Sequence, residues 1–275
     1  MIITDSQVHI WGADTLQRPW PKRAPPQRPI PLEKDELLQE MNAAGVNRAI
    51  IVPPSWEGDR NDLALEAASL HPDRFAIMGR LDTDLPESHG LMRTWRAQPG
   101  MLGIRVLFTT DVLREPLLAG RMEWFWASAE QLNMPIMALF PFPLMHLAED
   151  VISRYPNLRL IIDHMGMTGH AKGAAAFSGI ENLLALARHP HVAVKVSALP
   201  IFAEDAYPFK SIHTYIRQVY DAFGPQRMFW GSDLSRLTCP YRQCVTLFTE
   251  ELTWLSEADR EWIMGRAINE YLGWS

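Results

Sequence analysis

The sequence has few of the features that mark secreted, membrane-spanning or nucleic-acid-binding chains. Only two cysteines occur in 275 residues, Cys239 and Cys244, and two are too few for a disulfide framework. Their spacing is also not CxxC. No stretch reaches the ~18 continuous apolar residues of a membrane span. Lys and Arg are scattered and the net charge is −6, so nothing indicates a nucleic acid or a membrane surface as partner. No basic leader precedes an apolar run at the start, and we expect a cytoplasmic protein.

The motifs of several common enzyme classes are also missing. The sequence has no GxGxxG or GxxxxGK[ST] turn for a nucleotide, no GxSxG elbow of a serine hydrolase and no HExxH helix of a zinc protease. It also contains no internal repeat and no low-complexity tail. We therefore look for the function in single residues placed by the fold.

What the chain does contain is an alternation of short apolar runs with longer amphipathic runs. The short runs are apolar on both faces and often β-branched, which is typical of parallel strands buried on both sides. They cover residues 2–5, 48–52, 75–79, 102–107, 135–140, 158–163, 192–197 and 227–231. Helical patterns, several of them followed by Gly or Pro, cover residues 33–44, 61–71, 122–133, 143–154, 179–188, 209–223 and 240–255.

Eight strands that alternate with helices predict βαβ units and a parallel sheet with right-handed crossovers. The length of 275 residues is close to the roughly 250 residues of an eight-stranded α/β barrel. We therefore expect one (β/α)8 TIM-barrel domain over residues 1–275. A doubly wound open sheet is the alternative, but no Gly-rich phosphate turn follows the first strand.

One segment differs from this alternation. Residues 18–31 contain six prolines, which remove backbone donors and favour extended conformations, so neither a helix nor a central strand is expected there. A long loop between two regular elements is either a functional cover or disordered. Trp11 and Trp20 beside it favour a cover packed onto the barrel.

Polar side chains follow the predicted strands at the end where barrel enzymes carry their catalytic groups. Gln7 and His9 are two residues apart in extended chain and so share a face. His164 follows the sixth strand and Asp233 the eighth. Each has an ordinary interpretation, as a hydrogen-bonded core histidine or as an aspartate that caps a helix. Their convergence at one mouth favours a catalytic centre.

Three motifs in this order resemble the amidohydrolase-related (amidohydrolase 2) family of TIM-barrel metal-dependent hydrolases, in particular its lactonase-like branch. The motifs are Asp5-x-Gln7-x-His9, Asp163-His164-Met165-Gly166 and Trp230-Gly231-Ser232-Asp233, and the resemblance extends to the segment 265–269. It implies a hydrolase with His9, His164 and Asp233 as catalytic residues. In the family the strand-8 Asp holds the attacking water and takes its proton.

Two departures from the family pattern bear on the metal. Gln7 stands where the first His of a His-x-His pair belongs, and Phe140 or Leu139 stands where a strand-5 His belongs. His9, His164 and Asp233 remain as ligands, and they could still hold one zinc or manganese ion. We expect a centre that works without tightly bound metal. An apolar wall at Phe140 should then raise the pKa of Asp233 and make it a better base.

The resemblance also suggests substrate contacts. In the lactonase branch an Arg in the position of Arg105 binds a substrate carboxylate, which a guanidinium matches bidentately. A salt bridge at the barrel rim is the equal alternative for Arg105. Ser55 and the adjacent Trp56 follow the second strand and are expected to contact substrate, as are Gln7 and Phe140. His170 is expected to be a surface histidine, and Lys195 to be either a site residue or a solvated stem.

We therefore expect hydrolysis of a lactone in a small, carboxylated molecule, with Asp233 as the general base. Nonoxidative decarboxylation of an aromatic or unsaturated acid is the alternative reaction. A barrel that has lost catalysis and only binds ligands is the alternative of a different class. A homodimer is left open.

Overall fold

The computed structural model describes residues 1–21 and 26–274. Within this part of the chain an eight-stranded parallel sheet runs in sequence order from β1 to β8, which confirms the predicted barrel. The strands are β1 (Thr4–Val8), β2 (Arg48–Ile51), β3 (Phe75–Gly79), β4 (Met101–Leu107), β5 (Ile136–Leu139), β6 (Leu160–Ile162), β7 (Val192–Ser197) and β8 (Met228–Gly231). No helix among the described residues is long and apolar enough to cross a membrane.

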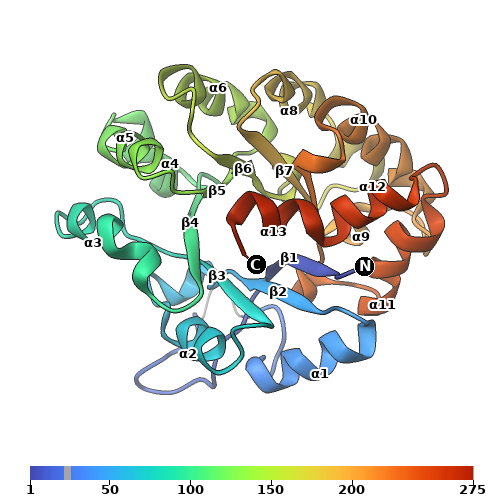
Figure 1. Ribbon diagram of the computed structural model, residues 1–275, viewed down its shortest axis with the longest axis horizontal. Coiled ribbons are helices and arrows are strands. Elements are labelled where there is room, and N and C mark those ends of the chain that lie inside the picture. Colours follow the sequence, from blue (N-terminus) through green and yellow to red (C-terminus); the bar gives the residue numbers. More distant parts are fainter. Residues whose placement is uncertain (22–25, 275) are drawn as a thin grey trace.

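Helices surround the strands in Figure 1 and cover the outside of the barrel. The seven predicted helical segments correspond to α1 (Lys34–Ala44), α2 (Asp62–Leu70), α5 (Glu123–Gln131), α6 (Met145–Arg154), α8 (Ile180–Ala185), α10 (His213–Phe223) and α11 (Tyr241–Thr246). Further helices are α3 (Ser88–Thr94), α4 (Asp111–Leu118), α7 (Gly173–Ala176), α9 (Leu199–Phe202), α12 (Glu257–Glu261) and α13 (Ala267–Leu272). The segment predicted as one helix over 240–255 is shorter, because α11 passes into a π-turn at Leu247–Glu251 and ends there.

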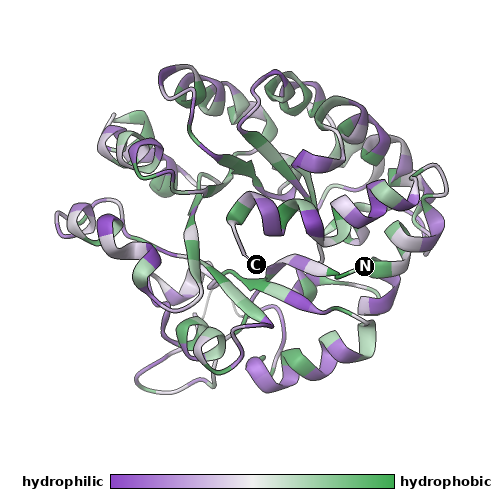
Figure 2. Ribbon diagram, viewed as in Figure 1, coloured by the Kyte–Doolittle hydropathy of each residue, from purple (hydrophilic) through white to green (hydrophobic). Residues whose placement is uncertain are grey.

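The strands are buried on both faces, as their apolar runs predict. β6 and β7 are strongly hydrophobic in Figure 2, whereas the outer helices carry polar residues as well. Even the polar members of β7, Lys195 and Ser197, are fully buried. The expectation that Lys195 could be a solvated stem is therefore wrong, because its side chain points into the barrel.

The amino-terminal end of the barrel is closed by α13. Ile268 and Leu272 of this helix pack against inward-facing strand residues such as Met78 and Phe229. Asn269 donates a 3.0 Å hydrogen bond to the Thr4 hydroxyl at the start of β1. Because this end is plugged, ligands reach the barrel interior from the carboxyl ends of the strands.

The Pro-rich segment is held on the barrel by contacts from several of its described residues; its residues 22–25 lie outside the described part. The Trp20 indole donates a 2.9 Å hydrogen bond to the Gly12 carbonyl, and Arg18 pairs with Glu57 and Asp62. Past the gap, Arg28 binds Glu40 of α1 and the Leu234 carbonyl beyond β8. This segment therefore runs over the same end of the barrel that carries the candidate site.

Candidate active site

A cleft of about 740 Å³ lies at the carboxyl ends of the strands. Its wall includes all three residues predicted to be catalytic, which follow β1, β6 and β8 in the sequence. The residues that line it are His9, Gln27, Pro54, Ser55, Trp56, Arg105, Leu107, Thr109, Leu139, His164, Met167, Thr168, Gly169, Asp233 and Arg236. The barrel thus brings together His9 and Arg236, which are 227 positions apart in the chain.

Asp233 lies at the centre of the polar contacts in this cleft. Its Oδ1 is 3.3 Å from His9 Nε2, and its Oδ2 is 3.9 Å from His164 Nε2. Arg236, one turn further along, donates to Oδ2 at 3.2 Å. The buried Oδ1 accepts no hydrogen bond from any residue that the structure describes. A buried carboxylate oxygen without a donor is costly, so this atom is suited to receive a proton donor from the cleft.

Backbone geometry aims these side chains. His164 and Asp233 both adopt left-handed conformations, with φ of 50° and 53°, where L-residues other than Gly are uncommon. The Asp233 N–H donates to the Gln7 carbonyl at 2.9 Å and thereby joins β8 to β1. Residues held in such conformations cost of order 1 kcal/mol each and cluster at functional sites.

The pKa of Asp233 is shifted in the opposite direction from the one expected from the sequence. Burial alone would raise its pKa, but His9, His164 and Arg236 together lower it below the usual value for Asp. The expected rise from an apolar wall at Phe140 is therefore wrong. Phe140 is fully buried against Phe108, with ring centroids 4.5 Å apart, and it does not line the cleft.

The two histidines have different partners on their second nitrogens. His9 Nδ1 lies 2.5 Å from the Val52 carbonyl, which can only accept, so Nδ1 carries the proton. His164 Nδ1 lies 2.8 Å from the Ser197 hydroxyl. Burial lowers the pKa of His164 to about 3, although Asp233 and Asp163 oppose the shift, so His164 is neutral near pH 7.

Gln7 is buried beneath His9 and does not line the cleft, so its expected contact with substrate is wrong. Its Oε1 accepts a hydrogen bond from the Lys195 ammonium, and its Nε2 lies 3.2 Å from His9 Nε2. Gln7 and His9 thus share a face, as predicted, but the glutamine lies below the histidine.

Lys195 and Arg105 both bind Asp163. Lys195 Nζ is 2.7 Å from Asp163 Oδ1, and Arg105 Nε donates to Oδ2 at 2.9 Å. Burial would raise the pKa of Asp163, but the two cations hold it at about 2. The salt-bridge interpretation of Arg105 is therefore confirmed at Nε. Its terminal nitrogens make no hydrogen bond to any residue of the described part, and the residue lines the cleft, so a second role in binding substrate remains open to it.

Of the remaining predicted residues, some line the cleft and others do not. Ser55 and Trp56 line it, and Trp56 packs edge-on against Trp11 with ring centroids 5.7 Å apart. Leu139, rather than Phe140, supplies the wall at the end of β5. His170 is exposed and does not line the cleft; in its loop, Gly169 is the last lining residue.

Arg236 and Gln27 are among the cleft residues that escaped the sequence analysis. Arg236 follows Asp233 by three positions, and this i, i+3 spacing beside a carboxylate is a signal that could have identified it. Gln27 belongs to the Pro-rich segment and accepts a 2.8 Å hydrogen bond from Ser235. No pattern in the sequence places Gln27 there, because its position depends on how the segment crosses the barrel.

Asp5 forms hydrogen bonds that link β1 to β8 and to α11. Its carboxylate accepts 2.9 Å hydrogen bonds from the backbone N–H groups of Gln7 and Ser232, and a 2.6 Å bond from the Tyr241 hydroxyl. Gly231 is required beside it, because a Cβ there would lie 2.6 Å from the Ser6 hydroxyl. These hydrogen bonds fix the two strand ends that carry His9 and Asp233.

These residues fit a divalent cation poorly. Lys195 fixes the Gln7 amide so that its N–H, rather than its oxygen, points at His9 Nε2, and this N–H occupies the lone pair that an ion needs. Leu139 offers no ligand on the β5 wall. Within residues 1–21 and 26–274, no group of three or more His, Cys, Asp or Glu is arranged to hold a metal. A metal-free centre remains a prediction.

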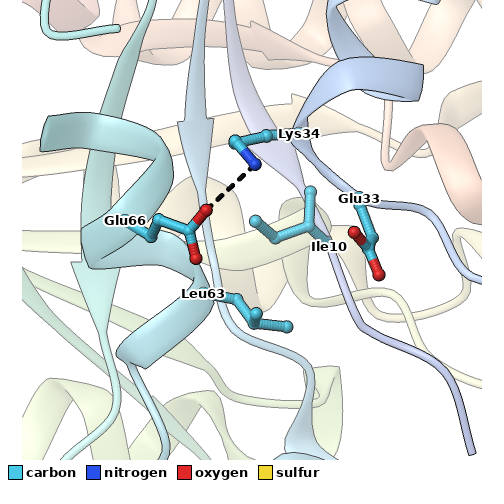
Figure 3. A pocket seen from close by; sticks show the side chains of 5 residues that line it. All are labelled: Ile10, Glu33, Lys34, Leu63 and Glu66. Atoms are coloured by element: carbon cyan, nitrogen blue, oxygen red, sulfur yellow. Dashed lines mark ion pairs between the residues drawn. The ribbon is translucent and has the colours of Figure 1, made fainter. Parts of the chain in front are cut away.

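A smaller hollow lies outside the barrel, between the start of α1 and α2 (Figure 3). Its charged residues include Lys34 and Glu66, which form a 3.0 Å ion pair across it. Ile10 and Leu63 form the apolar part, and Glu33 completes the lining. None of the strand-end groups described above reaches this hollow, so we treat it as a packing gap.

The fold and the cleft define an α/β-barrel enzyme with an Asp–His centre at the carboxyl ends of its strands. The amidohydrolase family model matches residues 4–271. The chain therefore belongs to the amidohydrolase family, and it is a hydrolase.

Two curated relatives are lactone hydrolases by name. The L-fucono-1,5-lactonase of Burkholderia ambifaria is 26% identical over 245 residues, which span 85% of this chain and 81% of that protein. The 4-sulfomuconolactone hydrolase of Hydrogenophaga intermedia is 24% identical over 238 residues, with 83% and 73% covered.

Solved structures agree on the fold. An amidohydrolase from Burkholderia multivorans with bound HEPES has a TM-score of 0.81 at 22% identity, covering 99% of both chains. A probable 2-pyrone-4,6-dicarboxylic acid hydrolase from Acinetobacter baumannii, with citric acid bound, has a TM-score of 0.77 at 16% identity and full coverage of both chains. A 5-carboxyvanillate decarboxylase from Sphingomonas paucimobilis has a TM-score of 0.69 at 14% identity, covering 99% of both chains.

Proposed function

We propose that this hydrolase opens a small lactone that carries a carboxylate, with Asp233 as the base that activates water. The observation that carries the proposal is the buried Asp233 Oδ1, which accepts no hydrogen bond from the described residues. It faces the cleft 3.3 Å from His9 Nε2, where a water molecule would be desolvated and oriented. Lactone hydrolysis is the activity in the names of both curated relatives.

In this mechanism Asp233 is ionised in the resting enzyme, because the Arg236 guanidinium donates to its Oδ2 at 3.2 Å and helps to lower its pKa. Asp233 Oδ1 takes one proton from water as the water oxygen bonds to the lactone carbonyl carbon. The ring C–O bond then breaks, and the proton on Asp233 passes to the leaving alkoxide. The product is a single hydroxy acid, and the Asp233 carboxylate is regenerated.

The developing oxyanion needs a fixed donor, since that contribution is usually large. His164 fits this role when the Ser197 hydroxyl donates to Nδ1, because the proton of the neutral ring then resides on Nε2. Such a donor reaches the carbonyl oxygen without being an acid strong enough to quench Asp233. We propose that His164 polarises the carbonyl in this way.

The cleft also indicates the class of substrate. Arg105 and Arg236 place two guanidinium groups in a cleft whose lining also includes the apolar Leu107, Leu139 and Met167. Because Arg236 is paired with Asp233 and Arg105 is bound to Asp163 only through Nε, Arg105 is the better partner for a substrate carboxylate. Ser55 at the mouth provides a hydroxyl for a ring or substituent oxygen.

A panel of small lactones, each with and without a carboxylate, tests the proposal. We expect release of the free acid, measured by proton release and by NMR, and a preference for the carboxylated member of each pair. Release of CO2 from an aromatic acid would support the decarboxylase alternative. Binding by calorimetry with no turnover would support the binding barrel.

A further inference from the structure

The Lys195 side chain is a buried cation that the mechanism above does not use. It is fully buried on β7 and contacts Asp163 Oδ1 at 2.7 Å and Gln7 Oε1. An ammonium group donates three hydrogen bonds and accepts none. The Gln7 amide must therefore turn its oxygen toward Lys195 and its NH2 group away from it.

The orientation of the Gln7 amide determines the hydrogen-bond role of His9 Nε2. The amide N–H of Gln7 faces His9 Nε2 at 3.2 Å, and a donor there requires Nε2 to be an acceptor. The Val52 carbonyl imposes the same arrangement from the other side of the ring, because it requires a proton on Nδ1. Two independent partners thus agree on the tautomer, as is usual where a second partner orients a functional histidine.

The consequence lies between His9 and Asp233. The single lone pair of His9 Nε2 is taken by the Gln7 N–H, so His9 has no proton to donate to Asp233 Oδ1, although the two atoms are only 3.3 Å apart. Asp233 Oδ1 therefore has no donor among the described residues. A water on the cleft side can donate one proton to Oδ1, and its lone pairs then point toward the substrate.

We propose that Gln7 and Lys195 are positioning residues that hold His9 Nε2 as a hydrogen-bond acceptor, so that Asp233 Oδ1 receives no proton from His9 and stays free to accept one from a bound water. The role of that water as the nucleophile rests on the proposed function, whereas the hydrogen-bond polarity is a property of the free protein. Gln7 stands where a metal-binding histidine was expected from the family pattern. Its amide cannot serve as that ligand, because it donates a hydrogen bond to His9 Nε2 instead.

Nitrogen-15 NMR of histidine-labelled protein tests the polarity directly. We expect His9, assigned by loss of its signals in His9→Asn, to carry a proton on Nδ1 and none on Nε2. Gln7→Glu places an acceptor against Nε2, which should then gain a proton, and kcat should fall about 10-fold or more with little change in KM. Gln218→Glu, the same exchange on the exposed face of α10, should change neither signal nor rate.

If Gln7→Glu does not fold, Gln7→Met is the second variant. It removes the donor without adding a charge, and Asp233 Oδ1 should then draw a proton onto Nε2. A proton on Nε2 in the unmodified protein, or an unprotonated Nε2 in the folded variants, would overturn the inference. If no lactone is turned over, the NMR result still decides the hydrogen-bond polarity, so the two failures are distinguishable.

Discussion

Replacing Asp233 with Asn removes the proposed base while keeping its surroundings. Asp233 has a φ of 53°, and Asn adopts this left-handed region more readily than most residues. Ala there would add backbone strain of roughly 1 kcal/mol and would mix a folding defect with a catalytic one. The Asn amide oxygen can still accept from Arg236, which now binds Oδ2 at 3.2 Å. We therefore expect Asp233→Asn to fold normally.

The expected loss follows from the role of a single proton acceptor. Removing a general base lowers the rate about 10²–10⁴-fold, which corresponds to about 2.7–5.4 kcal/mol of transition-state stabilisation. No side chain of the described residues can replace it easily, because His9 Nε2 already accepts from Gln7 and His164 is neutral and buried. We expect KM to change little, since Arg105 and Ser55 are untouched.

The assay is the initial rate of lactone opening by proton release, with kcat and KM determined for both proteins. Circular dichroism and thermal melting check that Asp233→Asn is folded. His170→Asn serves as the control, because His170 is exposed and lies outside the cleft lining, and its kcat should match that of the unmodified enzyme. A folded Asp233→Asn enzyme that keeps more than about a third of kcat would refute the role of Asp233 as base.

Three further predictions concern substrate, metal and pH. Arg105→Met should raise KM about 10–100-fold with a smaller effect on kcat, measured on the carboxylated lactone; an unchanged KM would leave only the salt bridge with Asp163. Elemental analysis should find well under one divalent ion per chain, activity should survive chelators, and Gln7→His with Leu139→His should increase metal uptake; a stoichiometric ion in the unmodified protein would contradict this. Because the pKa of Asp163 is lowered to about 2, its stabilising effect is present above pH ~4 and lost as the pH falls toward ~2. The free energy of unfolding, measured with urea, should therefore drop by about 2 kcal/mol from this group over that range, and a drop of equal size in Asp163→Asn would argue against it.

The order of strands and helices could be predicted from the sequence, because each of them has a local cause. Parallel strands buried on both faces need continuous apolar runs, and the runs at 75–79 and 192–197 match β3 and β7 residue for residue. The predicted first strand at 2–5 was too early, because β1 (Thr4–Val8) contains Asp5 and Gln7, whose polar side chains are hydrogen-bonded inside the barrel. Hydropathy alone cannot show such satisfaction.

The amino-acid sequence by itself determined the barrel, the family and the grouping of His9, His164 and Asp233, because strand periodicity and strand-end motifs are local properties. Only the tertiary structure decided what surrounds them. It placed Leu139 rather than Phe140 on the wall, since a one-residue step at a strand end moves a side chain from one face to the other. It also buried Gln7 and Lys195 in contact, although 188 positions separate them. The direction of the Asp233 pKa shift depends on charges from several strands, so no local pattern in the chain could contain it.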